Sequence, residues 1–279
     1  MPAPPERERE TMLSSPEESD SAKGKTTEWS VHGNTLDLND IIINLTKNVH
    51  RAGSCSGAVL SELETLARGI VGVKQSLETG CGRTTVMLSN ISRKHLCFCI
   101  DDRNIQQHNR STTSSVCFAI DNTYFNQDRV SFVFGPTQRT IRNYEFGETL
   151  LDFVFLDGPH AFPFVEMEYY FLYPHIRHGG ILGIDDIQIP NIANLFRFLR
   201  DDAMWNLISV VENTAFFERT KAPTFDPEGD YWKGQGYNAL RVPAHPILMR
   251  NIYIKHIQPW LKYLPANLKA RLKHVLLRH

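Results

Sequence analysis

Apolar and polar positions along this chain follow two periodicities. Residues 36–49 and 56–70 carry apolar side chains at the spacing of helices that bury one face. Beyond them, short apolar runs typical of buried strands alternate with further segments of helical spacing. The predicted strands are residues 73–79, 95–101, 130–134, 152–157 and 180–186. The predicted helices that follow them are residues 83–92, 105–115, 137–144, 164–176 and 192–205.

This alternation predicts an α/β fold, with a doubly wound and mostly parallel sheet covered by helices on both faces. Residues 207–220 end the series differently, because they have the pattern of two strands joined by a tight turn at Glu212 and Asn213. One strand of this closing hairpin would run antiparallel in an otherwise parallel sheet of seven strands.

The two ends of the chain differ from its middle. Residues 1–27 are rich in Pro, Glu, Ser and Lys, which predicts a disordered tail. Residues 28–243 would form one domain, and residues 244–279 would form a basic, amphipathic helical appendage. This appendage could pack on the domain, form a dimer interface, or make peripheral contact with an anionic membrane. Packing within the chain or in a dimer is the simpler role, and we expect the protein to form a homo-oligomer.

Composition narrows the class of protein. The chain has 279 residues and a net charge of −1, which argues against general nucleic-acid binding. No apolar stretch is long enough to span a membrane, so we expect a soluble, cytoplasmic protein. The five cysteines are odd in number and lack CxxC spacing, so we expect neither a disulfide framework nor a zinc site.

Two motifs follow predicted strands at positions where parallel sheets bind nucleotide-like ligands. The first is Glu78-Thr79-Gly80-Cys81-Gly82, whose glycines let the backbone approach a ligand, or simply make a turn. The second is Asp101-Asp102, where a carboxylate could accept hydrogen bonds from ribose hydroxyls or cap the next helix.

The glycine motif resembles the E-x-G-x-G motif of class I methyltransferases that use S-adenosyl-L-methionine (SAM). The resemblance implies a Rossmann-like methyltransferase fold and assigns the donor to Glu78, whose carboxylate would accept from the ammonium group of SAM, and to other residues near it. These are Gly80, Gly82, Thr84, Asp101, Asp102, Thr137 and Asp157. Pro136, between Gly135 and Thr137, departs from the family's usual Gly-Asp-Ser.

Asp157-Gly158-Pro159-His160 and, at the end of the next strand, Asp185-Asp186 resemble a branch of class I O-methyltransferases that includes metal-dependent sugar and natural-product enzymes. The resemblance implies that Asp157, Asp185 and Asp186 bind Mg²⁺ or Mn²⁺, which hard oxygen ligands suit. The alternative is that these aspartates cap turns and helices.

His160 and Asp157 are the candidate catalytic residues. His160 could take the proton of an acceptor hydroxyl, or order its own loop by hydrogen bonding to the backbone. The expected reaction is methyl transfer from SAM to a hydroxyl of a small molecule or saccharide, as in natural product biosynthesis. The rival hypotheses are an NAD-dependent oxidoreductase on the same sheet architecture and a non-catalytic or membrane-peripheral binding module.

Overall fold

The computed structural model describes residues 30–31, 34–35, 37–47, 55–70, 72–104, 113–224 and 235–241, together with residues 265 and 268. The tail at residues 1–27 and nearly all of the appendage at residues 244–279 lie outside these described residues. Among the described helices, none has the length and hydropathy needed to cross a membrane.

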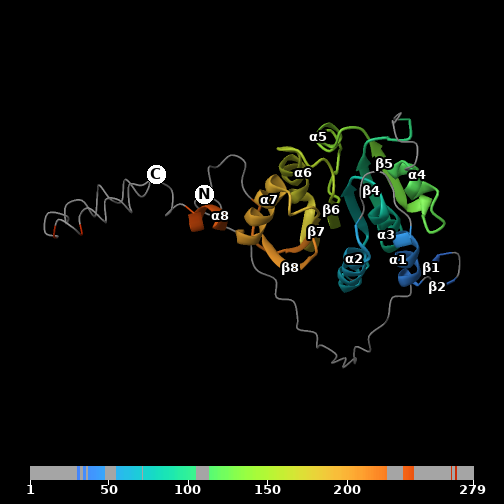
Figure 1. The fold of residues 1–279 in the computed structure, drawn as a ribbon, viewed down its shortest axis with the longest axis horizontal. Helices are drawn as coiled ribbons and strands as arrows, with labels where there is room; N and C mark the ends of the chain where they lie inside the picture. Colours follow the sequence, from blue (N-terminus) through green and yellow to red (C-terminus); the bar gives the residue numbers. More distant parts are fainter. Residues whose placement is uncertain are drawn as a thin grey trace, which may run out of the picture.

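A seven-stranded sheet forms the centre of the fold (Figure 1). Its strand order is β5-β4-β3-β6-β7-β9-β8, and only β9 runs antiparallel to its neighbours. The strands are β3 (Gln75–Thr79), β4 (Lys94–Cys99), β5 (Val130–Phe134), β6 (Leu151–Leu156), β7 (Ile176–Ile184), β8 (Trp205–Val211) and β9 (Thr214–Arg219). This confirms the predicted α/β fold and its closing hairpin, which turns at Glu212 with a positive φ of 52°.

The chain first builds outward from β3 through β4 to β5, and then returns to place β6 on the other side of β3. The direction of winding therefore reverses between β3 and β6. Loops that leave two such strands diverge to opposite faces of the sheet, which makes this point the usual ligand site of doubly wound folds.

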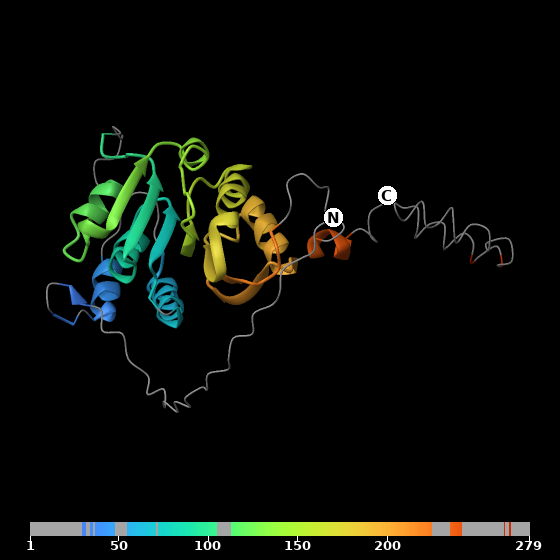
Figure 2. The same ribbon diagram turned by 180° about the vertical axis from the view of Figure 1, so that it is seen from behind.

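Helices cover both faces of the sheet (Figures 1 and 2). The first face carries α1 (Leu38–Lys47), α2 (Gly57–Gly69), α3 (Arg83–Ile91) and α4 (Ser115–Ile120). The second face carries α5 (Thr137–Thr140), α6 (Phe164–Leu172) and α7 (Pro190–Asp201), and α8 (Gly236–Arg241) contacts α7. Smaller elements are the hairpin of β1 (Ser30–Val31) and β2 (Asn34–Thr35) and two 3₁₀ turns, η1 (Gln127–Arg129) and η2 (Tyr173–His175).

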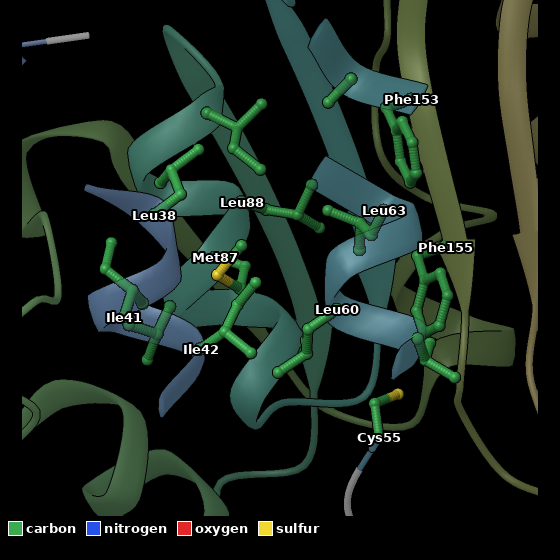
Figure 3. Packing of buried hydrophobic residues seen from close by; sticks show 14 of the residues in the cluster. Leu38, Ile41, Ile42, Cys55, Leu60, Leu63, Met87, Leu88, Phe153 and Phe155 are labelled. Atoms are coloured by element: carbon green, nitrogen blue, oxygen red, sulfur yellow. The ribbon is translucent and has the colours of Figure 1, made fainter. Parts of the chain in front are cut away.

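Alternation along β6 connects the two layers of the core. Phe153 and Phe155 point to the first face and belong to the cluster with α2 and α3, shown in Figure 3, whereas Val154 and Leu156 point to the second face. All four side chains are buried, which explains why residues 153–156 of β6 have a continuous apolar sequence rather than an alternating one.

Some element boundaries differ from the predictions. The described helix after β4 begins at Ser115, where the predicted helix of residues 105–115 ends, and residues 105–112 lie outside the described part. Strand β7 begins at Ile176 instead of residue 180, because a bulge and Gly179, with a positive φ of 72°, carry the polar start of this strand past Leu151.

Candidate functional site

At the carboxyl edge of the sheet, the backbone hydrogen bonds between strands continue for one more residue in four turns. In each turn, a backbone amide just after one strand donates to a carbonyl oxygen in the neighbouring strand. The pairs are Gly80 to Phe98 (2.9 Å), Gly135 to Cys99 (2.9 Å), Asp157 to Thr79 (3.2 Å) and Asp185 to Leu156 (3.0 Å). The motifs singled out in the sequence are therefore held in fixed register along one edge.

Gly80 links two of these turns. Its φ is +90°, and a Cβ atom at this position would lie 2.2 Å from the carbonyl oxygen of Asp157. Both the backbone conformation and the lack of space require glycine here. The glycine loop after β3 consequently packs directly against the backbone of the Asp157 turn after β6.

Glu78 lies inside the protein, with only 1% of its side chain exposed. Its Oε1 pairs with Nε2 of His95 at 3.0 Å, and its Oε2 accepts from the hydroxyl of Thr84 at 2.6 Å. His95 in turn bonds through Nδ1 to Ser76, which bonds to Ser92. Both oxygens of Glu78 thus have partners within the chain, and these bonds hold the start of α3. The contact of Glu78 with the ammonium group of SAM stays a prediction.

The two aspartates after β4 have different roles. Asp102 accepts from the backbone amides of Ser115 and Val116, at 2.7 and 3.2 Å, and so caps α4 as the alternative interpretation predicted. Asp101 is one-third exposed and forms a two-point hydrogen bond with Arg103, which lowers the pKa of the Asp101 carboxyl. Asp101 is therefore the carboxylate at this strand end that a ligand hydroxyl could reach.

Glu168 of α6 is a site residue that the sequence analysis missed. It accepts from Thr79 at 2.9 Å and from Thr137 at 2.5 Å, and a Cβ atom at Gly158 would lie 2.4 Å from its Oε1. Burial raises the pKa of the Glu168 carboxyl to about 7. This one side chain joins the ends of β3 and β6 to the start of α5, and Thr137 is turned toward it.

Asp157 and His160 lie next to each other in the loop after β6. Nε2 of His160 is 3.7 Å from Oδ1 of Asp157 and 2.9 Å from Oδ2 of Asp186. The backbone carbonyl of His160 accepts from Asn191 of α7 at 2.8 Å, which anchors the loop. Burial raises the pKa of the Asp157 carboxyl to about 7. The interaction of His160 with Asp157 raises the pKa of the His160 imidazole.

Asp185 and Asp186 point in different directions from the end of β7. The carboxylate of Asp185 accepts from Thr214 at 2.5 Å and from the thiol of Cys55 at 3.5 Å. Asp186 has a positive φ of 56° and accepts from Gln188 at 2.7 Å on the oxygen that does not face His160. Among the described residues, the partners of both carboxylates are side chains, whereas the alternative interpretation expected these aspartates to cap the next helix or loop.

The predicted metal ligands come together around Asp157. Its carboxylate groups with Cys55 and Asp185 on one side and with His160 and Asp186 on the other, and within each group the possible ligand atoms lie within 4.8 Å of one another. The charges of Asp185 and Asp186 raise the pKa of Asp157 further, a repulsion that a bound cation would relieve. These oxygen ligands fit a hard divalent cation.

Part of the chain is similar to a known protein family. Residues 77–187 match the family described as a methyltransferase domain. The strand order, with one antiparallel strand next to last in the sheet, is that of the Rossmann-like methyltransferase fold. A search of curated proteins found no match.

Solved structures with a similar fold are distant in sequence. One, from Staphylococcus aureus, has the proposed activity of a caffeoyl-CoA O-methyltransferase; it is 15% identical, covers 66% of this chain and 93% of its own, and has a TM-score of 0.48. The O-methyltransferase TomG from Streptomyces achromogenes, in complex with SAM, is 12% identical, with coverage of 65% and 90% and a TM-score of 0.47. CalS11, a TDP-rhamnose 3′-O-methyltransferase, is 15% identical, with coverage of 68% and 89% and a TM-score of 0.46.

Burial of Glu168 predicts a pH-dependent stability. Its pKa rises from 4.5 to about 7 on folding, so the folded protein holds this proton more tightly than the unfolded chain does. This proton adds about 3 kcal/mol to the free energy of unfolding below pH 4.5, the pKa in the unfolded chain. The added stability is lost as the pH rises from 4.5 through about 7, the pKa in the folded protein. We expect Glu168→Gln to remove this part of the pH dependence, measured by urea unfolding across that range.

The matched control is Glu148→Gln, because Glu148 is exposed at the opposite edge of the sheet, before β6. It should keep the pH dependence of the wild type. Equal dependence in wild type and Glu168→Gln would contradict the assignment of a buried, protonated Glu168.

Proposed function

We propose that this chain, whose residues 77–187 match a methyltransferase domain, transfers the methyl group of SAM to a hydroxyl oxygen of a small molecule or saccharide. The observation that carries the proposal is the contact of Gly80 with the carbonyl of Asp157. It sets the loop suited to the donor beside the only Asp-His cluster found among the described residues.

The donor would lie along the backbone of residues 80–82, where glycines leave room for the methionine part of SAM. Asp101 would accept hydrogen bonds from the ribose hydroxyls, and these bonds would replace its ion pair with Arg103. Glu78 and Asp102 would act indirectly, by fixing the beginnings of α3 and α4 through Thr84 and the amides of α4.

Asp157, Asp185 and Asp186 would hold a divalent cation, Mg²⁺ or Mn²⁺, which would supply an electrophile that lowers the pKa of the acceptor hydroxyl. The chemistry of the donor set supports this: possible ligand atoms of Asp157 lie within 4.8 Å of those of Asp185 in one group and of those of Asp186 in the other, and Asp157 and Asp186 are each about one-third exposed. Cys55 and Thr214 are buried, and their hydrogen bonds to the carboxylate of Asp185 fix its orientation.

His160 would take the proton of the acceptor on Nδ1, because Nε2 lies 2.9 Å from the carboxylate of Asp186, which keeps a proton on that nitrogen. The acceptor oxygen then forms a bond to the methyl carbon, while the carbon–sulfur bond breaks and its electron pair goes to sulfur. The products are a methyl ether and S-adenosylhomocysteine. The protein contributes alignment and proton transfer, because the anchored loop of His160 adjoins the glycine loop.

Isothermal titration of SAM into the purified protein tests the donor site. We expect wild type and Asp185→Ala to bind SAM, because Asp185 lies on the acceptor side, and Gly80→Arg to lose binding, because any side chain at this position collides with Asp157. Asp101→Asn, which changes a carboxylate that is one-third exposed, is the variant to use if Gly80→Arg fails to fold, as judged by its Tm, and it should weaken the binding of SAM. Glu148→Gln is the control.

NAD⁺ should give no heat of binding under the same conditions, which separates the proposal from an oxidoreductase. A folded wild type that does not bind SAM would sink the methyltransferase proposal and favour the non-catalytic binding module.

Electron paramagnetic resonance of Mn²⁺ tests the metal site separately. Free Mn²⁺ gives a strong signal that weakens when the ion is bound, so we expect wild-type protein to reduce it. Asp157→Asn and Asp186→Asn should restore the signal, since each removes a charged ligand, whereas Asp121→Asn, on an exposed acid after α4, should not. If wild-type protein leaves the Mn²⁺ signal unchanged, the proposed metal site is wrong and the carboxylates act without a metal ion.

A further inference from the structure

Three cysteines gather beneath the glycine loop, outside the acceptor cluster. Cys97 and Cys99 are two residues apart on β4, so their side chains share one face of the sheet, and Cys81 lies in the loop between Gly80 and Gly82. Their sulfur atoms all lie within 4.8 Å of one another, and all three cysteines are free thiols. The fold therefore brings together thiols that the sequence spacing does not pair.

Local hydrogen bonds fix the positions of two of the three thiols, those of Cys97 and Cys81. The thiol of Cys97 donates to the carbonyl of Gly80 at 3.1 Å, which draws β4 to the glycine loop. The thiol of Cys81 donates to the carbonyl of Ser115 and accepts from the hydroxyl of Thr85, at 3.7 and 3.5 Å. Cys81 is held on the side of the sheet that α4 covers, rather than pointing out of the loop.

Apolar side chains pack against the thiol group. Cys97 and Cys99 are buried together with Val116, and Ile120, Val130 and Phe132 pack against them. The possible ligand atoms of this group are all sulfur, in contrast to the two groups that share Asp157. Thiolate ligands select soft metal ions over Mg²⁺ and Ca²⁺.

We propose that Cys81, Cys97 and Cys99 form a three-thiolate site for a soft divalent metal ion, Zn²⁺ in the cell. Zinc–sulfur bonds of about 2.3 Å in a tetrahedral site place sulfurs about 3.8 Å apart, so the thiols need to approach by about 1 Å at most. Each thiol loses its proton on binding, and three protein ligands leave a fourth position for water.

Charge decides between a divalent and a monovalent ion. Three thiolates with Zn²⁺ leave one net negative charge, whereas three thiolates with Cu⁺ leave two. Because unpaired charge is costly in an apolar interior, the divalent ion is favoured. Binding through Cys81 would tie the glycine loop to β4 and so fix the loop that Gly80 sets against Asp157.

Cd²⁺ is the probe that tests this site, because its thiolate bonds absorb in the ultraviolet with an intensity that grows with the number of thiolates. We expect titration of the reduced, full-length protein to give a band of three-thiolate intensity that saturates at one Cd²⁺ per chain, and Zn²⁺ to displace it. Cys97→Ala and Cys99→Ala should lower the band, as should Cys81→Ser, the variant least exposed to folding problems because Cys81 is only partly buried.

Cys55→Ala and Cys117→Ser are the matched controls. Cys55 belongs to a separate group with two aspartates, and Cys117 belongs to none of the three groups found among the described residues, so both variants should keep the band. A folded, reduced wild type without the band would overturn the proposal, as would a band that persists in Cys81→Ser and in both alanine variants. A folded, reduced wild type that binds Cu⁺ but gives no band with Cd²⁺ would overturn the choice of a divalent ion.

Discussion

The close approach of Gly80 to the carbonyl of Asp157 is the constraint on which the rest of the site depends. No side chain fits between them, and a positive φ at Gly80 is needed to make the turn. Because β3 and β6 are neighbours at the point where the winding reverses, this contact brings a loop suited to a donor against a loop rich in acid–base groups. Donor and acceptor chemistry would otherwise lie at separate strand ends.

Buried polar groups stabilise this contact from both faces of the sheet. On the first face, Glu78 holds Thr84 and His95; on the second, Glu168 holds Thr79 and Thr137. Each buried carboxylate has hydrogen-bond partners on both oxygens, which offsets the cost of removing it from water. The acids that are about one-third exposed, Asp101, Asp157 and Asp186, are left for ligands. Acids at this edge of the sheet therefore fall into two sets: buried glutamates that stabilise the loops of the site, and partly exposed aspartates that can bind ligands.

Sequence pattern predicted the sheet well and the roles of its acids less well. Apolar runs such as that of β6 mark buried strands, and the turn at Glu212 marked the hairpin. Position predicted a capping role at the strand end after β4, and Asp102 has it. Position alone could not reveal that both oxygens of Glu78 have partners inside the protein, because this depends on side-chain direction at a strand end. Glu168 could have been found, since Val165, Glu168, Tyr169 and Leu172 follow the spacing of a buried helical face. The grouping of Cys81 with β4 depends on tertiary packing, which no local spacing encodes.

A crystal structure of the protein grown with S-adenosylhomocysteine would test the central claim most directly. The account predicts that the homocysteine part lies along residues 80–82, the ribose reaches Asp101, and the sulfur faces the side of the loop where Asp157 and His160 lie. A fully occupied ligand bound elsewhere, or one whose sulfur points away from His160, would contradict the claim that the Gly80–Asp157 contact joins donor and acceptor.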